Sequence, residues 1–333
     1  VPEGSSSTSL PTPCLEQYKD PEYVVQPRYW VHSNDVEPYL IDAPWELIKS
    51  YFDGDYDKLL YQVKTWLCGY YLNRGKRLED ASGVEILRDL SGISRETAKA
   101  IERDYLLEES QAEALLHSRD IKEALKDIFN ERKYKWLLAF RDVTNTTNER
   151  TTISTVIPAV AVGHKAPIII LYSNQKNDAF LLSANLNSFV FDYVSRQKVG
   201  GTSLGYFILQ QLPMIKHQDY SQSLTWTKGK VLKEWLQPKV LELLHVNYET
   251  KPLADSFGWT KPPTWDEERR FQLRCEIDAA YFHLYGVKRD DVDYIMETFP
   301  IVKEKDIARY GSYRTKETIL KYYDEMAKDK KTT

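Results

Sequence analysis

The chain has 333 residues, of which 42% are hydrophobic and 28% charged, and its formal net charge is −4. This length leaves room for two or three domains with ample core, and the composition is ordinary for a soluble globular protein. No apolar run reaches the length of a membrane span and no signal peptide opens the sequence, so we expect no membrane partner. The cysteines Cys14, Cys68 and Cys275 are too far apart for a zinc pattern or an obvious disulfide frame, which favours the reducing cytoplasm.

Residues 1–45 are predicted to be an N-terminal linker and docking segment. Residues 1–20 are rich in Ser, Thr and Pro, a composition typical of a linker or an extended tail. Residues 21–40 include Tyr23, Tyr29 and Trp30, and we expect this segment to dock on the recognition core. The first residue is Val rather than Met, which suggests a fragment of a longer chain or a processed form.

Residues 46–131 are predicted to form a helical insertion. Helices are expected over residues 59–72, 97–116 and 121–129. The last of these places apolar residues at i, i+4, i+7 and i+8 from Ile121, which is one face of a helix. The break at Asn73–Gly75 is typical of a helix end.

The distribution of charge differs between two segments. The insertion carries 13 Lys or Arg against 18 Asp or Glu, whereas Val194–Lys233 carries six against one. This predicts one acidic and one basic surface, unless the charges scatter in three dimensions. Ser94–Ile101 could form half of a helix-turn-helix, but no strongly basic recognition helix follows. A structural or partner-binding role for the insertion is therefore favoured.

Residues 132–245 are predicted to form a core of strands and helices. Strands are expected over residues 136–140, 153–162 and 167–172, which are apolar runs bounded by turn residues. The segment Arg141–Arg150 between the first two is too polar for a core, and its Asn, Thr and Arg side chains can hydrogen-bond base edges and phosphates. The alternatives are that Arg141 and Asp142 pair with each other or pin a turn, and that Asn145 and Asn148 only form turns.

A second polar segment follows the apolar, helix-like run Leu186–Val194. Here the sequence breaks into Arg196–Thr202, where two glycines stand beside two cations. Glycines let a backbone approach a ligand closely, and the cations favour a phosphate. The alternative is a simple tight turn at Gly200-Gly201.

Residues 246–333 are predicted to be helical. One helix is expected over residues 231–244, at the end of the preceding region, and others over residues 264–285 and 290–299 and from Thr315 onward. Thr264-Trp-Asp-Glu267 has the spacing of a capping box at a helix start. Pro300 is expected to stop the helix that precedes it.

The two polar segments carry a family resemblance. The pattern FRD…TNERT, followed by NLNSFVFDYVSRQKVGGTSLGYFILQQLP, resembles the target-recognition region of adenine-N6 DNA methyltransferases from bacterial restriction-modification and phage-defence systems. Asp293–Lys303, Tyr310–Lys316 and Pro27–Trp30 also resemble that family. The resemblance covers the ends and the middle of the chain and omits about residues 46–131.

The resemblance implies an α+β fold, with a mixed-strand recognition core, a helical insertion and a helical C-terminal region. It implies duplex DNA as partner, together with a catalytic methyltransferase domain and possible further proteins of a defence system. The candidate DNA-binding residues are Arg141, Thr144, Asn145, Asn148, Arg150, Arg196, Lys198, Gly200, Gly201, Thr202, Lys228 and Lys230.

The catalytic motifs of such methyltransferases are missing from this sequence. It has no glycine-containing loop for S-adenosylmethionine and no Asn/Asp-Pro-Pro-Tyr/Phe tetrad, to which Lys261-Pro-Pro-Thr264 is the nearest approach. We therefore expect no catalytic residue and no cofactor in this chain, with S-adenosylmethionine bound by a separate catalytic domain. The six histidines are isolated, so no metal site is expected.

Three functions remain open at this point. The first is sequence-specific binding of duplex DNA, and the second is a protein-interaction module built on the insertion. The third is a metal-dependent nuclease fragment, for which Glu249-Thr-Lys251 has the spacing of half a motif without a convincing partner Asp.

Overall fold

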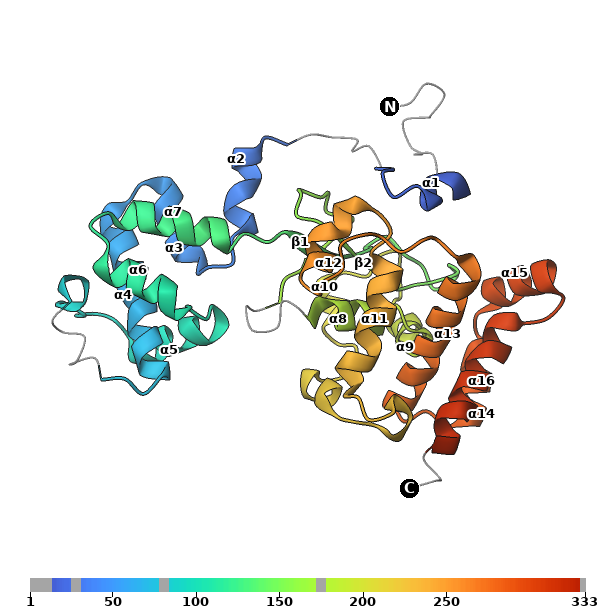
Figure 1. The fold of residues 1–333 in the computed structure, drawn as a ribbon. Helices are drawn as coiled ribbons and strands as arrows, with labels where there is room; N and C mark the ends of the chain where they lie inside the picture. Colours follow the sequence, from blue (N-terminus) through green and yellow to red (C-terminus); the bar gives the residue numbers. More distant parts are fainter. Residues whose placement is uncertain (1–13, 25–30, 78–83, 172–177, 330–333) are drawn as a thin grey trace. The chain divides into compact units, whose positions relative to one another are not determined.

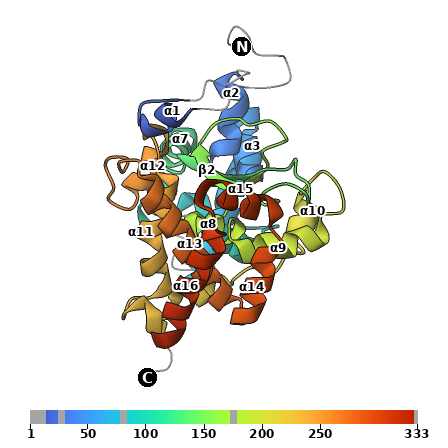
Figure 2. The ribbon, with the colours of Figure 1, turned by 90° about the vertical axis from the view of Figure 1, so that its right-hand side faces the viewer.

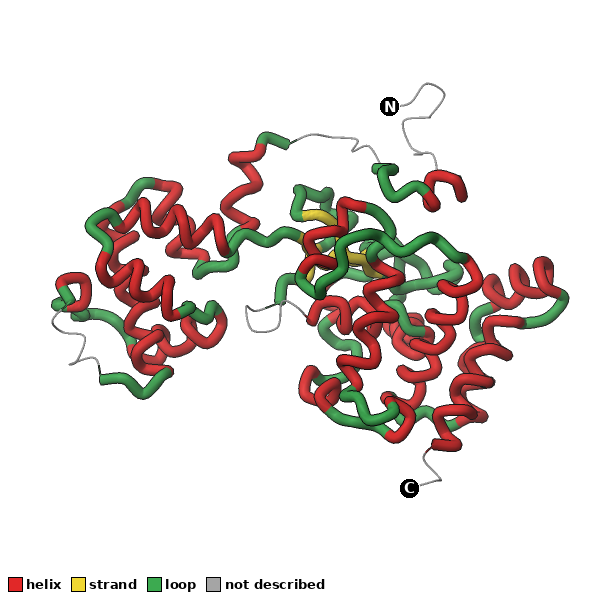
Figure 3. The backbone as a smooth tube through the Cα atoms, viewed as in Figure 1, coloured by secondary structure: helices red, strands yellow, loops and turns green. Residues whose placement is uncertain are grey.

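The computed structural model describes residues 14–24, 31–77, 84–171 and 178–329. Most of these residues are helical, and three short strands form one antiparallel sheet (Figure 3). The α+β fold class is therefore confirmed. The chain divides into two compact units. We call residues 29–135 with 170–177 the helical unit, and the remainder the core unit (Figure 1).

The helical unit contains the predicted insertion. Its elements are α2 (Ser33–Val36), η1 (Glu37–Leu40), α3 (Trp45–Asp53), α4 (Tyr56–Asn73), η2 (Glu85–Leu87), α5 (Arg95–Asp104), α6 (Glu109–His117) and α7 (Ile121–Glu131). The apolar face predicted for α7 is confirmed, since all four of its residues are buried. The single helix predicted over 97–116 is wrong. Two helices form because the buried Glu102 carboxylate accepts from the Leu107 backbone N–H, which turns the chain between them.

A close approach of two helices marks the centre of this unit. A Cβ added at Gly69 on α4 would lie 2.1 Å from the backbone oxygen of Ala98 on α5. Only glycine allows α4 and α5 to pack this closely. Trp66, one turn earlier, is buried and donates from its indole to the Tyr105 carbonyl at 2.8 Å.

The helical unit has a paired stem at its two ends. Ile41 and Lys133 form an antiparallel bridge, and Asp42 N–H donates to the Arg132 carbonyl at 3.0 Å. The buried Arg132 guanidinium also donates to the Asp42 carbonyl at 2.6 Å. The stem therefore includes residues on both sides of the predicted 46–131 insertion.

The sheet lies in the core unit. Its strands are β1 (Trp136–Phe140), β2 (Ser154–Pro158) and β3 (Ile168–Ile169), in the order β2-β1-β3. All three predicted strands exist, although β2 and β3 are shorter than expected. Tyr172, which was predicted to end the last strand, lies outside the described residues. Leu137–Phe140 are buried on both faces, which explains why this strand reads as a continuous apolar run.

Helices make up most of the core unit. They are α1 (Leu15–Lys19), α8 (Ala179–Leu186), α9 (Phe189–Lys198), α10 (Tyr206–Leu209), η4 (His217–Ser221), η5 (Thr225–Thr227), α11 (Leu232–Leu244), η6 (Tyr248–Thr250), α12 (Lys251–Asp255), α13 (Glu267–Leu284), α14 (Arg289–Glu297), α15 (Pro300–Tyr310) and α16 (Arg314–Asp329). The central α13 packs against α11 on one side and α16 on another (Figures 1 and 2). The largest apolar cluster unites α8, α11, α13, α14 and α16.

Three local predictions in the core unit are corrected. The helix predicted from Leu186 begins anew at Phe189, where Ser188 is the N-cap, and it continues to Lys198 instead of breaking at Val194. Asp266, rather than Thr264, caps α13, because its carboxylate accepts from Arg269 N–H. Pro300 follows the end of α14, as predicted, and it is also the first residue of α15, a position whose backbone N–H has no partner within a helix.

Residues 18–23 of the N-terminal segment contact the core unit. Tyr18 stacks on Trp265 with ring centroids 5.5 Å apart. Tyr248 N–H donates to the Pro21 carbonyl at 3.1 Å, and Asn247 reaches the Tyr23 carbonyl. These contacts attach residues 18–23 to the core unit. Pro27–Trp30 lies outside the described residues.

Candidate nucleic-acid interface

The two polar segments that were singled out in the sequence lie beside each other in the core unit. Val143 and Ser203 form an antiparallel bridge. Thr144 N–H donates to the Thr202 carbonyl at 3.1 Å, and Leu204 N–H donates to the Asp142 carbonyl at 2.8 Å. We call the exposed residues around this contact the paired-loop face: Val143, Thr147, His164, Lys165, Lys198, Gly200, Gly201, Thr202, Ser203, Tyr206 and Phe207.

Asp142 holds the paired-loop face together. Its carboxylate accepts from the Ser203 hydroxyl and from Lys165 Nζ, the latter at 3.2 Å. These two hydrogen bonds lower the pKa of Asp142 below its ordinary value. Asp142 N–H also donates to the Lys165 carbonyl at 3.1 Å. The carboxylate therefore connects three separate loops. Its hydrogen-bond partners are Ser203 and Lys165, and not Arg141 as one alternative has it.

The Asn145 side chain builds a turn. Its Oδ1 accepts from the Thr147 backbone N–H at 3.0 Å, as an Asx turn does. Thr144 is buried and donates to the Thr151 carbonyl at 2.6 Å. Arg141 donates to the Arg150 carbonyl at 2.7 Å. Three of the candidate DNA-binding residues thus have local structural partners.

The buried carboxylate of Asp192 on α9 organises the end of the same loop. It accepts from Arg150 Nε at 2.6 Å and from the backbone N–H groups of Thr151 and Thr152 at 3.0 and 3.2 Å. The Arg150 guanidinium also donates to the Asn187 carbonyl and covers the Phe189 ring at 4.1 Å. Arg150 is therefore one half of an internal ion pair.

Arg196 was predicted to contact a phosphate, and the structure gives it other partners. Its side chain is only 10% exposed. It donates to the carbonyls of Asn148 and Glu149 at 2.8 and 2.9 Å, to the Thr298 carbonyl at 3.1 Å, and lies 4.1 Å over the Phe299 ring. Burial lowers the pKa of Arg196. Because a cation in this position satisfies the backbone of the 144–150 loop, we correct its role to that of a loop anchor.

The remaining candidates of the second segment are exposed. Lys198 ends α9, and Gly200, Gly201 and Thr202 follow it at the surface. A Cβ added at either glycine would meet nothing within 4 Å, and neither glycine has a positive φ. Neither the packing nor the backbone conformation of this chain therefore requires glycine at these two positions.

An aromatic pair borders the same face, and the sequence prediction missed it. On α10, Phe207 is 78% exposed and Tyr206 is 49% exposed. The Tyr206 hydroxyl donates to the Ile168 carbonyl at 2.8 Å, which fixes α10 against β3. The signal in the sequence is the pair Tyr206-Phe207 directly after Gly205, on a helix of only four residues that cannot bury both rings.

Lys228 and Lys230 do not join the paired-loop face. They stand in the turn between η5 and α11, where Lys228 takes a left-handed conformation with φ of 54°. The 3-10 helix η5 that precedes this turn packs on α16. Burial raises the pKa of the Glu276 carboxyl on α13, and Lys228 is one of several nearby cations that oppose this rise. The two lysines form a separate exposed basic turn.

Within the part of the chain that the structure describes, no three His, Cys, Asp or Glu side chains are grouped so that they could hold a metal ion. Among the same residues no helix is both long and apolar enough to cross a membrane.

Comparison with known proteins adds no relative. No family model, no curated protein and no solved structure matches this chain.

Proposed function

We propose that the paired-loop face binds duplex DNA, and that the chain is the target-recognition part of a site-specific DNA adenine-N6 methyltransferase or restriction-modification enzyme of the bacterial cytoplasm. In this proposal the methyl transfer belongs to a separate catalytic domain, which binds S-adenosylmethionine. The resemblance in sequence supplies the reaction class, and the geometry of the face supplies the argument for contact with a nucleic acid.

The two glycines carry the proposal. Gly200 and Gly201 are exposed, and the fold would accept a side chain at either. Their effect is to leave the backbone N–H groups of the loop open to a partner that approaches closely, as a phosphate does. Lys198 and Lys165 belong to the same face and have exposed side chains, although Lys165 Nζ also binds Asp142. Such cations supply the salt-dependent part of DNA affinity.

Phe207 supports the same function by a different route. Large exposed aromatic rings stack on bases or wedge between base steps in many DNA-binding proteins. At 78% exposure, Phe207 buries little apolar surface within its own chain, so its removal would cost the fold little.

Fluorescence anisotropy with a labelled mixed-sequence duplex tests the proposal across a series of salt concentrations. Combining Lys165→Gln with Lys198→Gln should weaken binding to all sequences alike and lower the salt slope by about 2, because two phosphate contacts are lost. The matched control combines Lys122→Gln with Lys126→Gln on α7, where both lysines are exposed. If the first pair behaves like the control pair, the paired-loop face does not meet DNA.

The helical unit offers a second candidate function, the binding of another protein of a defence complex. Tyr39 and Trp45 are 64% and 44% exposed and stack on each other with centroids 5.2 Å apart. Exposed Tyr and Trp are enriched at protein interfaces, and the excess of acidic residues in this unit favours a basic partner. Trp45→Ser should then abolish that association while leaving DNA affinity intact, and loss of DNA affinity in this variant would argue against the division of roles.

A further inference from the structure

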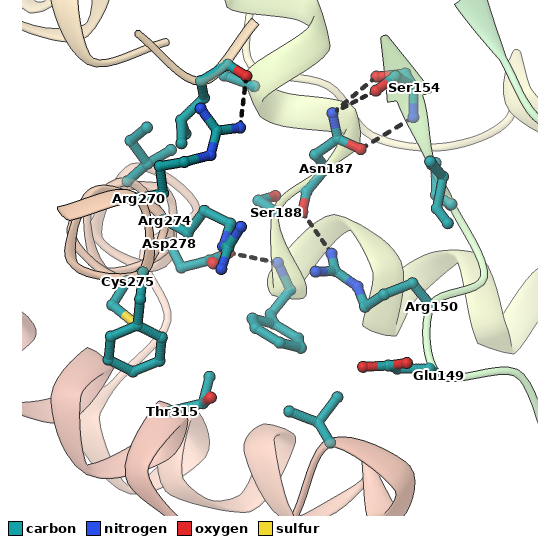
Figure 4. A pocket seen from close by; sticks show the side chains of 18 of the residues that line it. Glu149, Arg150, Ser154, Asn187, Ser188, Arg270, Arg274, Cys275, Asp278 and Thr315 are labelled. Carbon is teal, nitrogen blue, oxygen red and sulfur yellow. Dashed lines mark hydrogen bonds between the residues drawn. The ribbon is translucent and has the colours of Figure 1, made fainter. Parts of the chain in front are cut away.

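A cavity of about 730 Å³ opens in the core unit. Its walls are the loop 149–155, the junction of α8 and α9, one face of α13, and the helix α15 (Figure 4). The cavity is larger than an internal packing defect and falls within the size range of small-molecule sites. Much of its lining is apolar, including Phe189, Phe271, Ile277 and Val302.

Arg270 on α13 lies in this wall without a carboxylate partner among the described residues. Its guanidinium donates to the carbonyls of Glu242 and Leu243, both at 2.9 Å, and covers the Trp265 ring at 4.1 Å. Its Nε is buried and has no hydrogen-bond partner. Burial, followed by the nearby charge of Arg274, lowers the pKa of Arg270 to about 10. The carboxylate of Glu242 binds Arg269 instead.

Arg274 stands one helical turn further along α13 and reaches toward the same cavity (Figure 4). Its guanidinium forms neither a hydrogen bond nor an ion pair with any residue in the described part of the chain. Two like charges at i and i+4 on a helix repel each other. Arg270 and Arg274 therefore bring two positive charges together beside an apolar cavity, and the buried carboxyl of Asp278, whose ionised form Arg274 favours, offsets them only in part.

The other cations of the cavity differ from this pair, because each has its own carboxylate. Arg150 binds Asp192 at 2.6 Å, Lys305 binds Glu149 at 2.5 Å and Arg309 binds Glu267 at 3.3 Å. The remaining cavity carboxylates are also occupied. Asp278 accepts from Phe189 N–H at 2.7 Å, and Asp306 accepts from Thr315 N–H at 2.6 Å.

We propose that this cavity binds a nucleoside phosphate, whose phosphate group lies between Arg270 and Arg274 and whose base enters the apolar interior. Two guanidinium groups provide several donors in fixed planes, which suits the oxygens of a phosphate. Phe271 and Tyr310 line both this cavity and the adjoining one of about 300 Å³. The Arg314 guanidinium covers one face of each ring, so a base would stack on the opposite face. An anion here removes the repulsion between the two arginines. The nucleotide can be a free molecule or a unit of a DNA strand, since both present the same chemistry. This inference does not rest on the paired-loop face.

Isothermal titration calorimetry of the full chain with the four nucleoside 5′-monophosphates, inorganic phosphate and a 12-mer DNA single strand tests the site. At least one monophosphate should bind with 1:1 stoichiometry, and inorganic phosphate should bind at least 10-fold more weakly. Arg274→Gln should reduce that affinity about 10-fold or more, because a charge-assisted hydrogen-bonding group is lost. Arg289→Gln is the matched control, since Arg289 pairs with Asp324 on the surface of the same unit.

The unliganded variant provides an independent readout. Arg274 makes no direct hydrogen bond or ion pair but favours the ionised form of Asp278, so Arg274→Gln should lower the melting temperature only slightly, whereas loss of a structural residue would lower it strongly. If the DNA single strand binds in a way that depends on Arg274 and no monophosphate binds, the ligand is a unit of a DNA strand and not a free nucleotide. Inorganic phosphate binding as tightly as every nucleotide would overturn the base site. Absence of all binding, or binding unchanged in Arg274→Gln, would overturn the proposal altogether. Lys165→Gln with Lys198→Gln should leave nucleotide binding unchanged, which separates this site from the paired-loop face.

Discussion

Asp278 is the buried carboxyl whose removal should change stability most clearly with pH. It lies on α13 at the wall of the cavity and accepts a hydrogen bond from Phe189 N–H at the start of α9. Burial raises its pKa from the usual value of 3.8 to about 6, although Arg150 and Arg274 favour the ionised form. Asp278→Asn keeps the acceptor for Phe189 and removes the charge.

The size of the effect follows from the two pKa values. A carboxyl that ionises near 3.8 when unfolded and near 6 when folded makes the ionised state cost about 3 kcal/mol of stability. Because the folded pKa is the higher one, the stability that protonated Asp278 contributes is fully present below about pH 4. It is lost as the pH rises from about 4 to about 6, and the stability no longer changes with this group above pH 6. Asn does not titrate, so Asp278→Asn should be more stable than the parent by about 3 kcal/mol at pH 8 and nearly equal to it at pH 4.

Urea denaturation of both proteins at pH 4, 6 and 8 measures this difference. The exposed Asp290 on α14 provides the control, since Asp290→Asn should change stability by about 0.5 kcal/mol or less at each pH. A difference between Asp278→Asn and the parent that stays constant from pH 4 to pH 8 would show that the buried carboxyl is not the group that titrates.

Two further substitutions test the packing of each unit. Arg196→Lys should destabilise the core unit by about 3 kcal/mol, because a single ammonium cannot reach the carbonyls of Asn148, Glu149 and Thr298 together. In thermal melts the control Lys198→Gln, at an exposed position, should show no comparable loss of stability. Equal losses in the two variants would refute the role of Arg196 as a loop anchor. Gly69→Ala should destabilise the helical unit by about 3 kcal/mol, because the new Cβ would lie 2.1 Å from the Ala98 backbone oxygen. The control Gly163→Ala, where an added Cβ would meet nothing within 4 Å, should be nearly neutral. A folded Gly69→Ala protein with an unchanged melting temperature would contradict the close packing of α4 on α5.

Periodicity predicted the elements that bury a continuous or regular apolar surface. The strand Trp136–Phe140 and the face of α7 that begins at Ile121 are examples, because burial itself selects their residues. The break between α8 and α9 was missed. There Asn187 bonds both the backbone of Ser154 and the Ser183 carbonyl, and its partners lie up to 33 residues away.

The candidate site was predicted only in part, for a physical reason. The sequence around an Arg or Lys in a polar segment does not reveal whether the partner of that side chain is a phosphate or an internal carboxylate. The clue that separates the cases is Asp192 inside the apolar run Phe189–Val194, since a buried carboxylate requires cations or N–H donors around it. The cavity could not have been predicted, because Arg150, Arg270 and Lys305 converge from segments more than 30 residues apart.

The paired stem of the helical unit has a consequence for how such a chain can change over time. Ile41 and Lys133 face each other as an antiparallel pair, for which backbones stand about 5 Å apart. A two-residue hairpin turn spans that gap. The two ends of the segment between Ile41 and Lys133 therefore lie next to each other. Insertion or deletion of this whole segment in a single genetic event would leave the surrounding chain with almost no gap to close. Such an event would change the helical unit and leave the core unit intact.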